Sequence, residues 1–142
     1  MSSDAGMSDQ DAALSENLEF YRAFSTRDMA AMERIWSGTA PVSCIHPGWP
    51  PLFGRDAVLT SWRNILRGPE SPRVLCYEER VAVHGEIAIV TCDEELPGGT
   101  VIATNIFVRE RGLWRLVHHQ GSPLMTSRSP NQRRPEDGAT RH

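Results

Sequence analysis

The sequence predicts an α+β fold, a strongly curved antiparallel sheet wrapped over N-terminal helices. Two observations lead to this class. Helical patterns dominate the first half of the chain, and four strand patterns follow one another through the second half with short turns between them. Consecutive strands joined in this way form an antiparallel meander, and helices that precede it pack on one of its faces. A curved sheet over a long helix leaves a cone with an open mouth, where we expect a ligand to bind.

Length and composition predict one folded domain. The chain has 142 residues and a formal net charge of −3. We expect the domain over residues 11–124, with disorder in residues 1–10 and 125–142, which are rich in polar residues. The sequence has no basic stripe with interleaved aromatic residues and no apolar run of ~20 residues, so neither nucleic acid nor a membrane is an expected partner. Its start lacks an apolar signal segment, which favours a cytoplasmic protein.

The helical half begins with residues 11–26, where Leu14, Leu18 and Tyr21 share one face and Phe20 and Phe24 extend it. Such a wide apolar face is typical of a helix that lies across a sheet. A short helix over residues 29–36 follows, capped by Asp28, and a third is predicted over residues 56–66.

The strand half is predicted over residues 73–83, 87–96, 101–109 and 113–120. A further short strand, residues 41–46, lies between the second and third helices and ends at the loop Pro47-Gly-Trp-Pro-Pro51.

The last two strands form the most informative hairpin. Alternation predicts an inner row in which amide and imidazole groups stand among aromatic ones, typical of a pocket wall. The inner row is Ala103, Asn105, Phe107, Trp114, Leu116, His118 and Gln120, and the outer row includes Ile102, Ile106, Val117 and His119.

Two histidines are candidate catalytic groups. His46 ends the first short strand near the expected cone mouth, and His118 shares the inner row with Trp114. Either could exchange a proton at neutral pH, although His46 could instead only pin the proline-rich loop. His119 is predicted to face outward. Because adjacent strand residues point to opposite faces, His118 and His119 do not predict a metal site.

Acidic candidates lie at the end of residues 87–96. Asp93 and Glu95 share one face of that strand, and Glu94 takes the other. An isomerase or dehydratase needs a carboxylate in an apolar cavity, with its pKa raised toward neutrality, and Asp93 or Glu95 is the predicted base. The alternative is a solvated strand end beside a Pro-Gly-Gly turn.

Ligand contact is predicted for one amide and several apolar side chains. Asn105 lies in mid-strand and needs a hydrogen-bond partner if it is buried. Trp49 stands in a loop between prolines and could cover the mouth. The other predicted contacts are Tyr21, Trp62, Phe107 and Leu116.

No cofactor is predicted. All fifteen basic residues are arginines, which excludes lysine Schiff-base chemistry and a P-loop lysine. Cys44, Cys76 and Cys92 form no CxxC pair, and we expect buried, reduced thiols.

The predicted outer face of the sheet is apolar. A monomer would leave these side chains in water, so we expect a homodimer that packs through this face. The residues assigned to it are Val81, Val90, Cys92, Ile102, Ile106 and Val117.

Several stretches resemble the nuclear transport factor 2-like superfamily and, within it, the SnoaL-like proteins. They are Phe20-Tyr-Arg-Ala-Phe24 with Asp28, Trp36, Ile45-His-Pro-Gly48, Gly54, Trp62, Ala103-Thr-Asn-Ile-Phe107, Trp114-Arg-Leu-Val-His-His119 and Ser122-Pro123. The chain is also similar to the association domain of calcium/calmodulin-dependent kinase II, which has an arginine where Asn105 stands here.

The resemblance implies a cystatin-like, cone-shaped α+β barrel that forms homodimers. It implies a fold more strongly than an activity, because the superfamily includes isomerases, dehydratases, cyclases and binding modules. Three functions follow as hypotheses: a small-molecule-binding pocket protein, a cofactor-independent isomerase or dehydratase acting on a hydrophobic carbonyl compound, and an association module.

Overall fold

The computed structural model describes residues 7–126 of the chain. This part contains three helices and six strands, and it confirms the predicted α+β class. The elements in order are α1 (Asp9–Thr26), α2 (Met29–Ile35), β1 (Ser43–Ile45), β2 (Leu52–Phe53), α3 (Arg55–Arg67), β3 (Leu75–His84), β4 (Ile87–Leu96), β5 (Gly99–Glu110) and β6 (Leu113–Pro123).

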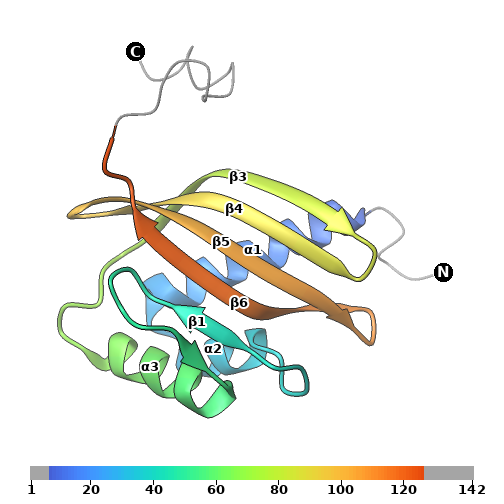
Figure 1. Cartoon of the computed structure of the whole chain (residues 1–142), viewed down its shortest axis with the longest axis horizontal. Helices are drawn as coiled ribbons and strands as arrows, with labels where there is room; N and C mark the ends of the chain where they lie inside the picture. The colour runs from blue at the N-terminus through green and yellow to red at the C-terminus, as the bar shows by residue number, and fades with distance from the viewer. Residues whose placement is uncertain (1–6, 127–142) are drawn as a thin grey trace.

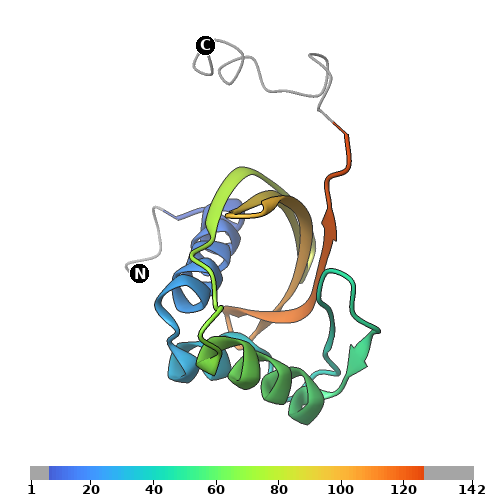
Figure 2. The ribbon, with the colours of Figure 1, turned by 90° about the vertical axis from the view of Figure 1, so that its left-hand side faces the viewer.

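The six strands form one curved sheet in the order β2-β1-β6-β5-β4-β3 (Figure 1). The predicted meander is confirmed, since β3 to β6 pair antiparallel with their neighbours. β1 pairs parallel with β6, so the sheet is mixed. Figure 2 shows the sheet as an arc with α1 across its open side and α2 and α3 at one end. The sheet does not close into the barrel that the resemblance implies, because β2 and β3 remain its edges.

Helix α1 begins two residues before the predicted domain start. Ser8 caps it by accepting a hydrogen bond from the backbone N–H of Asp11 at 3.0 Å. The helix ends at Arg27, whose left-handed backbone (φ 59°) closes the last turn. Residues 9 and 10 are therefore helical, whereas the disorder predicted for residues 1–6 and 127–142 falls outside the described residues. No helix in residues 7–126 is long and apolar enough to cross a membrane.

Strand register sets which side chains of β4 face the helices. Residues directly opposite on paired strands share a face, and Val90 pairs with Asn105 while Cys92 pairs with Ala103. All four side chains are buried on the inner face. The outward assignment of Val90 and Cys92 is therefore wrong. Val81 pairs with Val90 and also packs against the core, so its outward assignment is wrong for the same reason.

A one-residue bulge in β6 reverses the inward direction along that strand. Leu116 pairs with Phe107 and His118 pairs with Ile106, so Val117 has no partner on β5. Trp114 and Leu116 face inward before the bulge, as predicted. After it, His119 is the inward residue, with 1% of its surface exposed, and His118 lies on the outer face. The predicted directions of His118 and His119 are therefore wrong, because simple alternation omits the extra residue.

We predict that Gly121→Ala destabilises the fold by about 1–3 kcal/mol, the usual cost of overpacking a core position. A Cβ atom at Gly121 would stand 2.9 Å from Val101 Cγ1 and 3.1 Å from Pro47 Cγ. Urea unfolding followed by circular dichroism measures the loss. Gly98→Ala is the matched control, because a Cβ atom there meets nothing within 4 Å. Equal stability of the two variants would contradict this packing.

Candidate functional site

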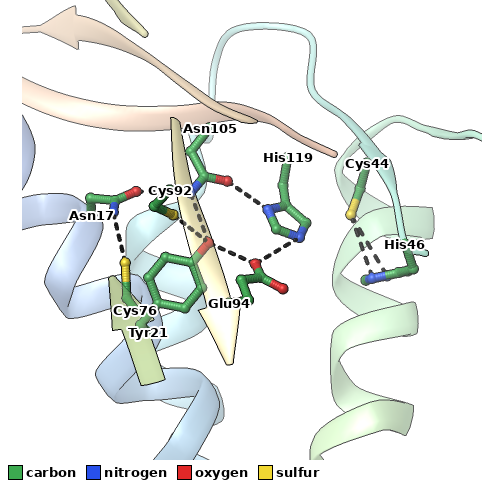
Figure 3. A network of polar contacts seen from close by, with 9 residues as sticks. All are labelled: Asn17, Tyr21, Cys44, His46, Cys76, Cys92, Glu94, Asn105 and His119. Atoms are coloured by element: carbon green, nitrogen blue, oxygen red, sulfur yellow. Dashed lines mark hydrogen bonds and ion pairs between the residues drawn. The ribbon is translucent and has the colours of Figure 1, made fainter. Parts of the chain in front are cut away.

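Five buried polar side chains meet on the inner wall of the sheet, under α1. We call Asn17, Tyr21, Glu94, Asn105 and His119 the polar network (Figure 3). Helix α1 supplies the first two, and β4, β5 and β6 supply one each. None is more than 3% exposed. Because each buried polar group loses hydration, such a group of residues has to be hydrogen-bonded internally.

The hydrogen bonds of the network form a continuous path. The Tyr21 hydroxyl donates to Glu94 Oε2 at 2.6 Å, and Asn105 Nδ2 lies 3.1 Å from the Tyr21 oxygen. Asn105 Oδ1 lies 2.5 Å from His119 Nδ1. His119 Nε2 lies 3.8 Å from Glu94 Oε2, which is too far for a hydrogen bond. The short hydroxyl–carboxylate contact is the one that most directly controls the acidity of Glu94.

The outer members of the network fix its orientation. Asn17 Oδ1 accepts from Asn105 Nδ2 at 2.8 Å, and Asn17 Nδ2 contacts the sulfur of Cys76 at 3.8 Å. The thiol of Cys92 donates to the Tyr21 hydroxyl at 3.3 Å. These contacts join α1 to β3, β4 and β5, so the helix and the sheet hold the network together.

Glu94 has the electrostatics of an acid–base group. Burial raises its pKa from 4.5 to about 7, although the hydrogen bond from Tyr21 acts in the opposite direction. Burial, together with the nearby Glu94 and Cys92, holds the pKa of Tyr21 well above 10. Near neutral pH, Tyr21 therefore remains a donor while Glu94 can hold or release a proton.

His119 is neutral at physiological pH. Burial lowers its pKa to about 3, and His46 and His118 contribute to the shift. The neutral imidazole packs 5.1 Å from the Phe20 ring and 5.8 Å from the Trp62 ring, measured between centroids. An imidazole in this state can accept a proton or a hydrogen bond through one of its nitrogens.

His46 lies next to the network. Its ring centroid is 6.4 Å from that of His119 and 4.7 Å from that of Trp49. Its Nε2 bonds Ser61 Oγ at 2.9 Å, and Ser61 donates to the Val58 carbonyl at 2.7 Å. The Ser61 hydroxyl therefore accepts from His46 Nε2–H, which leaves Nδ1 as the unprotonated nitrogen. Burial lowers the pKa of His46 to about 4.

A groove of about 710 Å³ opens at the end of the sheet close to Glu94. Residues 69–72, 96–101 and 123–125 line it. Val101 lines this groove and also pairs with Glu94 across β5 and β4. Val101 therefore connects the wall of the groove to the strand position opposite Glu94.

The structure brings some predicted site residues together. Tyr21 and Asn105 belong to the polar network, and His46 and Trp62 pack beside it. Phe107 and Leu116 are fully buried in the adjoining core, whereas Trp49 is 45% exposed and covers His46 from the loop.

Other predicted catalytic residues lie elsewhere. His118 bonds Ser43 at 2.7 Å on the outer face. Asp93 pairs with Ile102 on that face, and Glu95 accepts from Thr100 at 2.7 Å near the turn. Register explains the displacement, since the face shared by Asp93 and Glu95 turns away from α1.

Sequence reasoning missed Glu94, His119 and Asn17. Glu94 was detectable, because it alternates with Cys92 and Val90 and those apolar residues indicate a buried face. Asn17 stands one helical turn before Tyr21, which places both on the same face of α1. His119 had no signal in the pattern, since only the bulge turns it inward. Within residues 7–126, no three histidine, cysteine or acidic side chains are grouped so as to hold a metal ion.

The family model described as the SnoaL-like domain matches residues 14–126. A solved structure from Streptomyces avermitilis, a candidate dehydratase of the nuclear transport factor 2-like family, is 33% identical with a TM-score of 0.77. That match covers 83% of this chain and 97% of the other.

A second solved structure is a candidate calcium/calmodulin-dependent protein kinase type II association domain from Thiobacillus denitrificans. It is 31% identical with a TM-score of 0.72, and the match covers 79% of this chain and 94% of that one. F-box protein SKIP8 of Arabidopsis thaliana is 29% identical over 116 residues, which are 80% of this chain and 50% of that protein. The chain therefore spans about half the length of this curated relative.

We predict that Glu94→Gln changes the pH dependence of stability in one direction. The folded state keeps the Glu94 proton up to a pKa of about 7, while the unfolded chain loses it near 4.5. Between these pH values the folded state binds more protons, so wild-type stability falls relative to Glu94→Gln as pH rises, by about 3 kcal/mol in total. Above the folded pKa the difference is constant.

Urea unfolding of both proteins from pH 4 to pH 8.5 measures this difference. His46 and His119 have lowered pKa values and lose stability as pH falls, but they are present in both proteins and cancel in the comparison. A pH-independent difference between wild type and Glu94→Gln would show that Glu94 has the same pKa in the folded and unfolded states.

Proposed function

Because the chain belongs to the SnoaL-like family, we propose that it binds a small molecule at the mouth of its cone and acts on it through Glu94 as a general acid–base group. One observation carries the proposal: a carboxyl group that is 2% exposed accepts a 2.6 Å hydrogen bond from Tyr21 and lies 3.8 Å from a histidine. This arrangement pairs a buried acid with a hydrogen-bond donor, as acid–base catalysis requires, whereas the sequence had offered Asp93 or Glu95 as the candidate base.

The chemistry that fits this site is proton transfer beside a carbonyl group. A general acid–base group is most effective when its pKa lies near the working pH, as burial makes it for Glu94. An isomerase would take a proton from one carbon and return it to another. A dehydratase would take a proton from carbon and give one to a departing hydroxyl group, which leaves as water. Both reactions need no cofactor.

The same electrostatics favour an uncharged, largely hydrophobic ligand. His46 and His119 are neutral at physiological pH, and the network holds no arginine. An anionic ligand would therefore find no charge partner there and would repel the ionised form of Glu94. A hydrophobic carbonyl compound matches the aromatic side chains of Trp49, Trp62 and Phe20 around the two histidines.

The candidate dehydratase from Streptomyces avermitilis supports the reaction class, since it is 33% identical over almost its whole length. In this proposal His46 and Trp49 contact the ligand from the loop side, and Asn105 holds His119. We place the protein in the cytoplasm, which fits its three free cysteines.

We predict that Glu94→Gln lowers kcat at least 100-fold on any substrate found, with a small effect on KM, because the amide cannot exchange the proton. Substrates are found by a thermal-shift screen of hydrophobic ketones and β-hydroxy ketones, followed by turnover assays. Glu95→Gln is the matched control, since this neighbouring acid bonds Thr100 on the outer side and should leave turnover unchanged. Retained turnover in Glu94→Gln would contradict the acid–base role of Glu94. Ligand binding without turnover in the wild type would contradict catalysis and show that the protein only binds its ligand.

The outer face of the sheet favours a second function, self-association. Ile89, Ile102 and Ile106 lie on that face and are only half-buried, and Ile87 is 43% exposed. The similarity to the Thiobacillus denitrificans association domain, at 31% identity, supports this function. We propose a homodimer through this face, which leaves the inner face for a ligand.

We predict that the wild type sediments at twice its chain mass of 15.9 kDa at micromolar concentration. Ile106→Arg places a charge in the centre of the outer face and should yield the monomer, because a charge cannot be buried in an apolar contact without a partner. Analytical ultracentrifugation measures both. Thr60→Arg, on the exposed side of α3, is the control, and a monomeric wild type would exclude the dimer.

A further inference from the structure

We infer that Asn105 is a positioning residue that fixes His119 in the Nδ1–H tautomer, so that the unprotonated Nε2 of His119 faces Glu94. The catalytic meaning of this inference rests on the proposed function, and it names two further residues of that site. The hydrogen atoms along the polar network can be counted, because every donor and acceptor in it is buried.

The count begins at Tyr21, whose hydroxyl carries one hydrogen. Its oxygen is 3.3 Å from the Cys92 thiol, which donates, and its shortest contact is with Glu94 Oε2. The single hydroxyl hydrogen is therefore directed at Glu94 Oε2, which lies 2.6 Å away. Glu94 Oε2 is thus an acceptor in this contact.

The orientation of the Asn105 amide follows from the same bonds. Its Nδ2 carries two hydrogens, and these meet Asn17 Oδ1 at 2.8 Å and the Tyr21 oxygen at 3.1 Å. A reversed amide would place Oδ1 against the Tyr21 oxygen, whose only hydrogen is already used by Glu94. Two buried acceptors would then face each other at a cost of about 1–3 kcal/mol. The amide oxygen therefore faces His119.

This orientation determines the tautomer of His119. Asn105 Oδ1 can only accept, so the 2.5 Å contact requires a hydrogen on His119 Nδ1. A neutral imidazole with its hydrogen on Nδ1 has a lone pair on Nε2, and that nitrogen faces Glu94 Oε2 at 3.8 Å. The two atoms are too far apart for a hydrogen bond, and a lone pair rather than an N–H hydrogen faces the carboxyl group.

The surroundings favour a proton on Glu94. The titratable groups around Glu94 and His119 are Tyr21 from α1, Cys44 and His46 from β1 and its loop, Cys76 from β3, Cys92 from β4 and His118 from β6. Burial keeps His46 and the Cys44 thiol neutral at pH 7, with pKa values of about 4 and about 12. Burial of Glu94 raises its pKa to about 7, so the carboxyl group keeps its proton below that pH.

A protonated Glu94 is an acid at the start of the reaction. In the first step it gives its proton to an oxygen atom of the substrate, and the carboxylate that remains takes a proton from a carbon atom, so Glu94 begins and ends the cycle with one proton. His119 Nε2 offers this carboxylate no N–H hydrogen, which keeps it basic. Without Asn105, His119 could present Nε2–H to Glu94. This hydrogen would favour the carboxylate form of Glu94 and lower the pKa of Glu94.

Nitrogen NMR of histidine-labelled protein tests the inference directly. Long-range ¹H–¹⁵N correlations at pH 7.5 distinguish a protonated from an unprotonated ring nitrogen, and His119 is assigned by its loss in His119→Gln. We expect His119 Nδ1 protonated and Nε2 unprotonated in the wild type. Asn105→Asp keeps an acceptor for Nδ1–H and should keep this pattern, whereas Asn105→Leu removes the acceptor and should shift His119 toward Nε2–H.

An Nε2–H tautomer in the wild type, or an unchanged tautomer in folded Asn105→Leu, would overturn the inference. The wild-type spectrum remains decisive if Asn105→Leu does not fold. The readout does not depend on turnover, so the two proposals fail separately. Loss of activity in Glu94→Gln together with a wild-type Nε2–H tautomer would overturn only the role of Asn105. Retained activity in Glu94→Gln together with a wild-type Nδ1–H tautomer would overturn only the proposed function.

Discussion

The site depends on the hydrogen bond between Tyr21 and Glu94, which joins α1 to β4 inside the cone. Burying a carboxyl group costs several kcal/mol unless the group is hydrogen-bonded or protonated. Glu94 accepts a hydrogen bond from Tyr21 and can also be protonated. The Tyr21 hydroxyl stabilises the charged form, and burial stabilises the neutral form. Because the two effects oppose each other, Glu94 can change its protonation state near neutral pH without breaking the contact between helix and sheet.

Strand geometry separates two surfaces with different properties. The bulge at Val117 turns His119 inward to Asn105 and leaves His118 outside beside Ser43. The inner face of the sheet consequently carries the polar network, and the outer face carries half-buried isoleucines. The two solved structures with about one-third identity are a candidate dehydratase and a candidate association domain.

The sequence predicted the order of helices and strands because their apolar periods are long and their turns are marked by glycine. It predicted Asn105 and His46 as site residues from strand alternation, and Tyr21 and Trp62 from the apolar faces of their helices. It did not predict the pairing of β1 with β6 or the short strand β2, which depend on contacts between distant segments.

The errors concern register. Asp93 and Glu95 were preferred over Glu94 because the apolar face of Val90 and Cys92 was assigned to the outside of the sheet. The pairing of Glu94 with Val101 and of Cys92 with Ala103 places that face inside. The single unpaired residue Val117 exchanged the faces that were predicted for His118 and His119, and alternation along the sequence does not reveal such a bulge.

The central claim is that Glu94 is a buried acid that titrates near neutrality. Carbon NMR of protein labelled at the glutamate side-chain carboxyl carbon follows each glutamate through a pH titration, and Glu94→Gln identifies the Glu94 signal. The account predicts that this signal titrates at a pKa of about 7. A Glu94 signal that titrates below pH 5, like a carboxyl group in water, would contradict it.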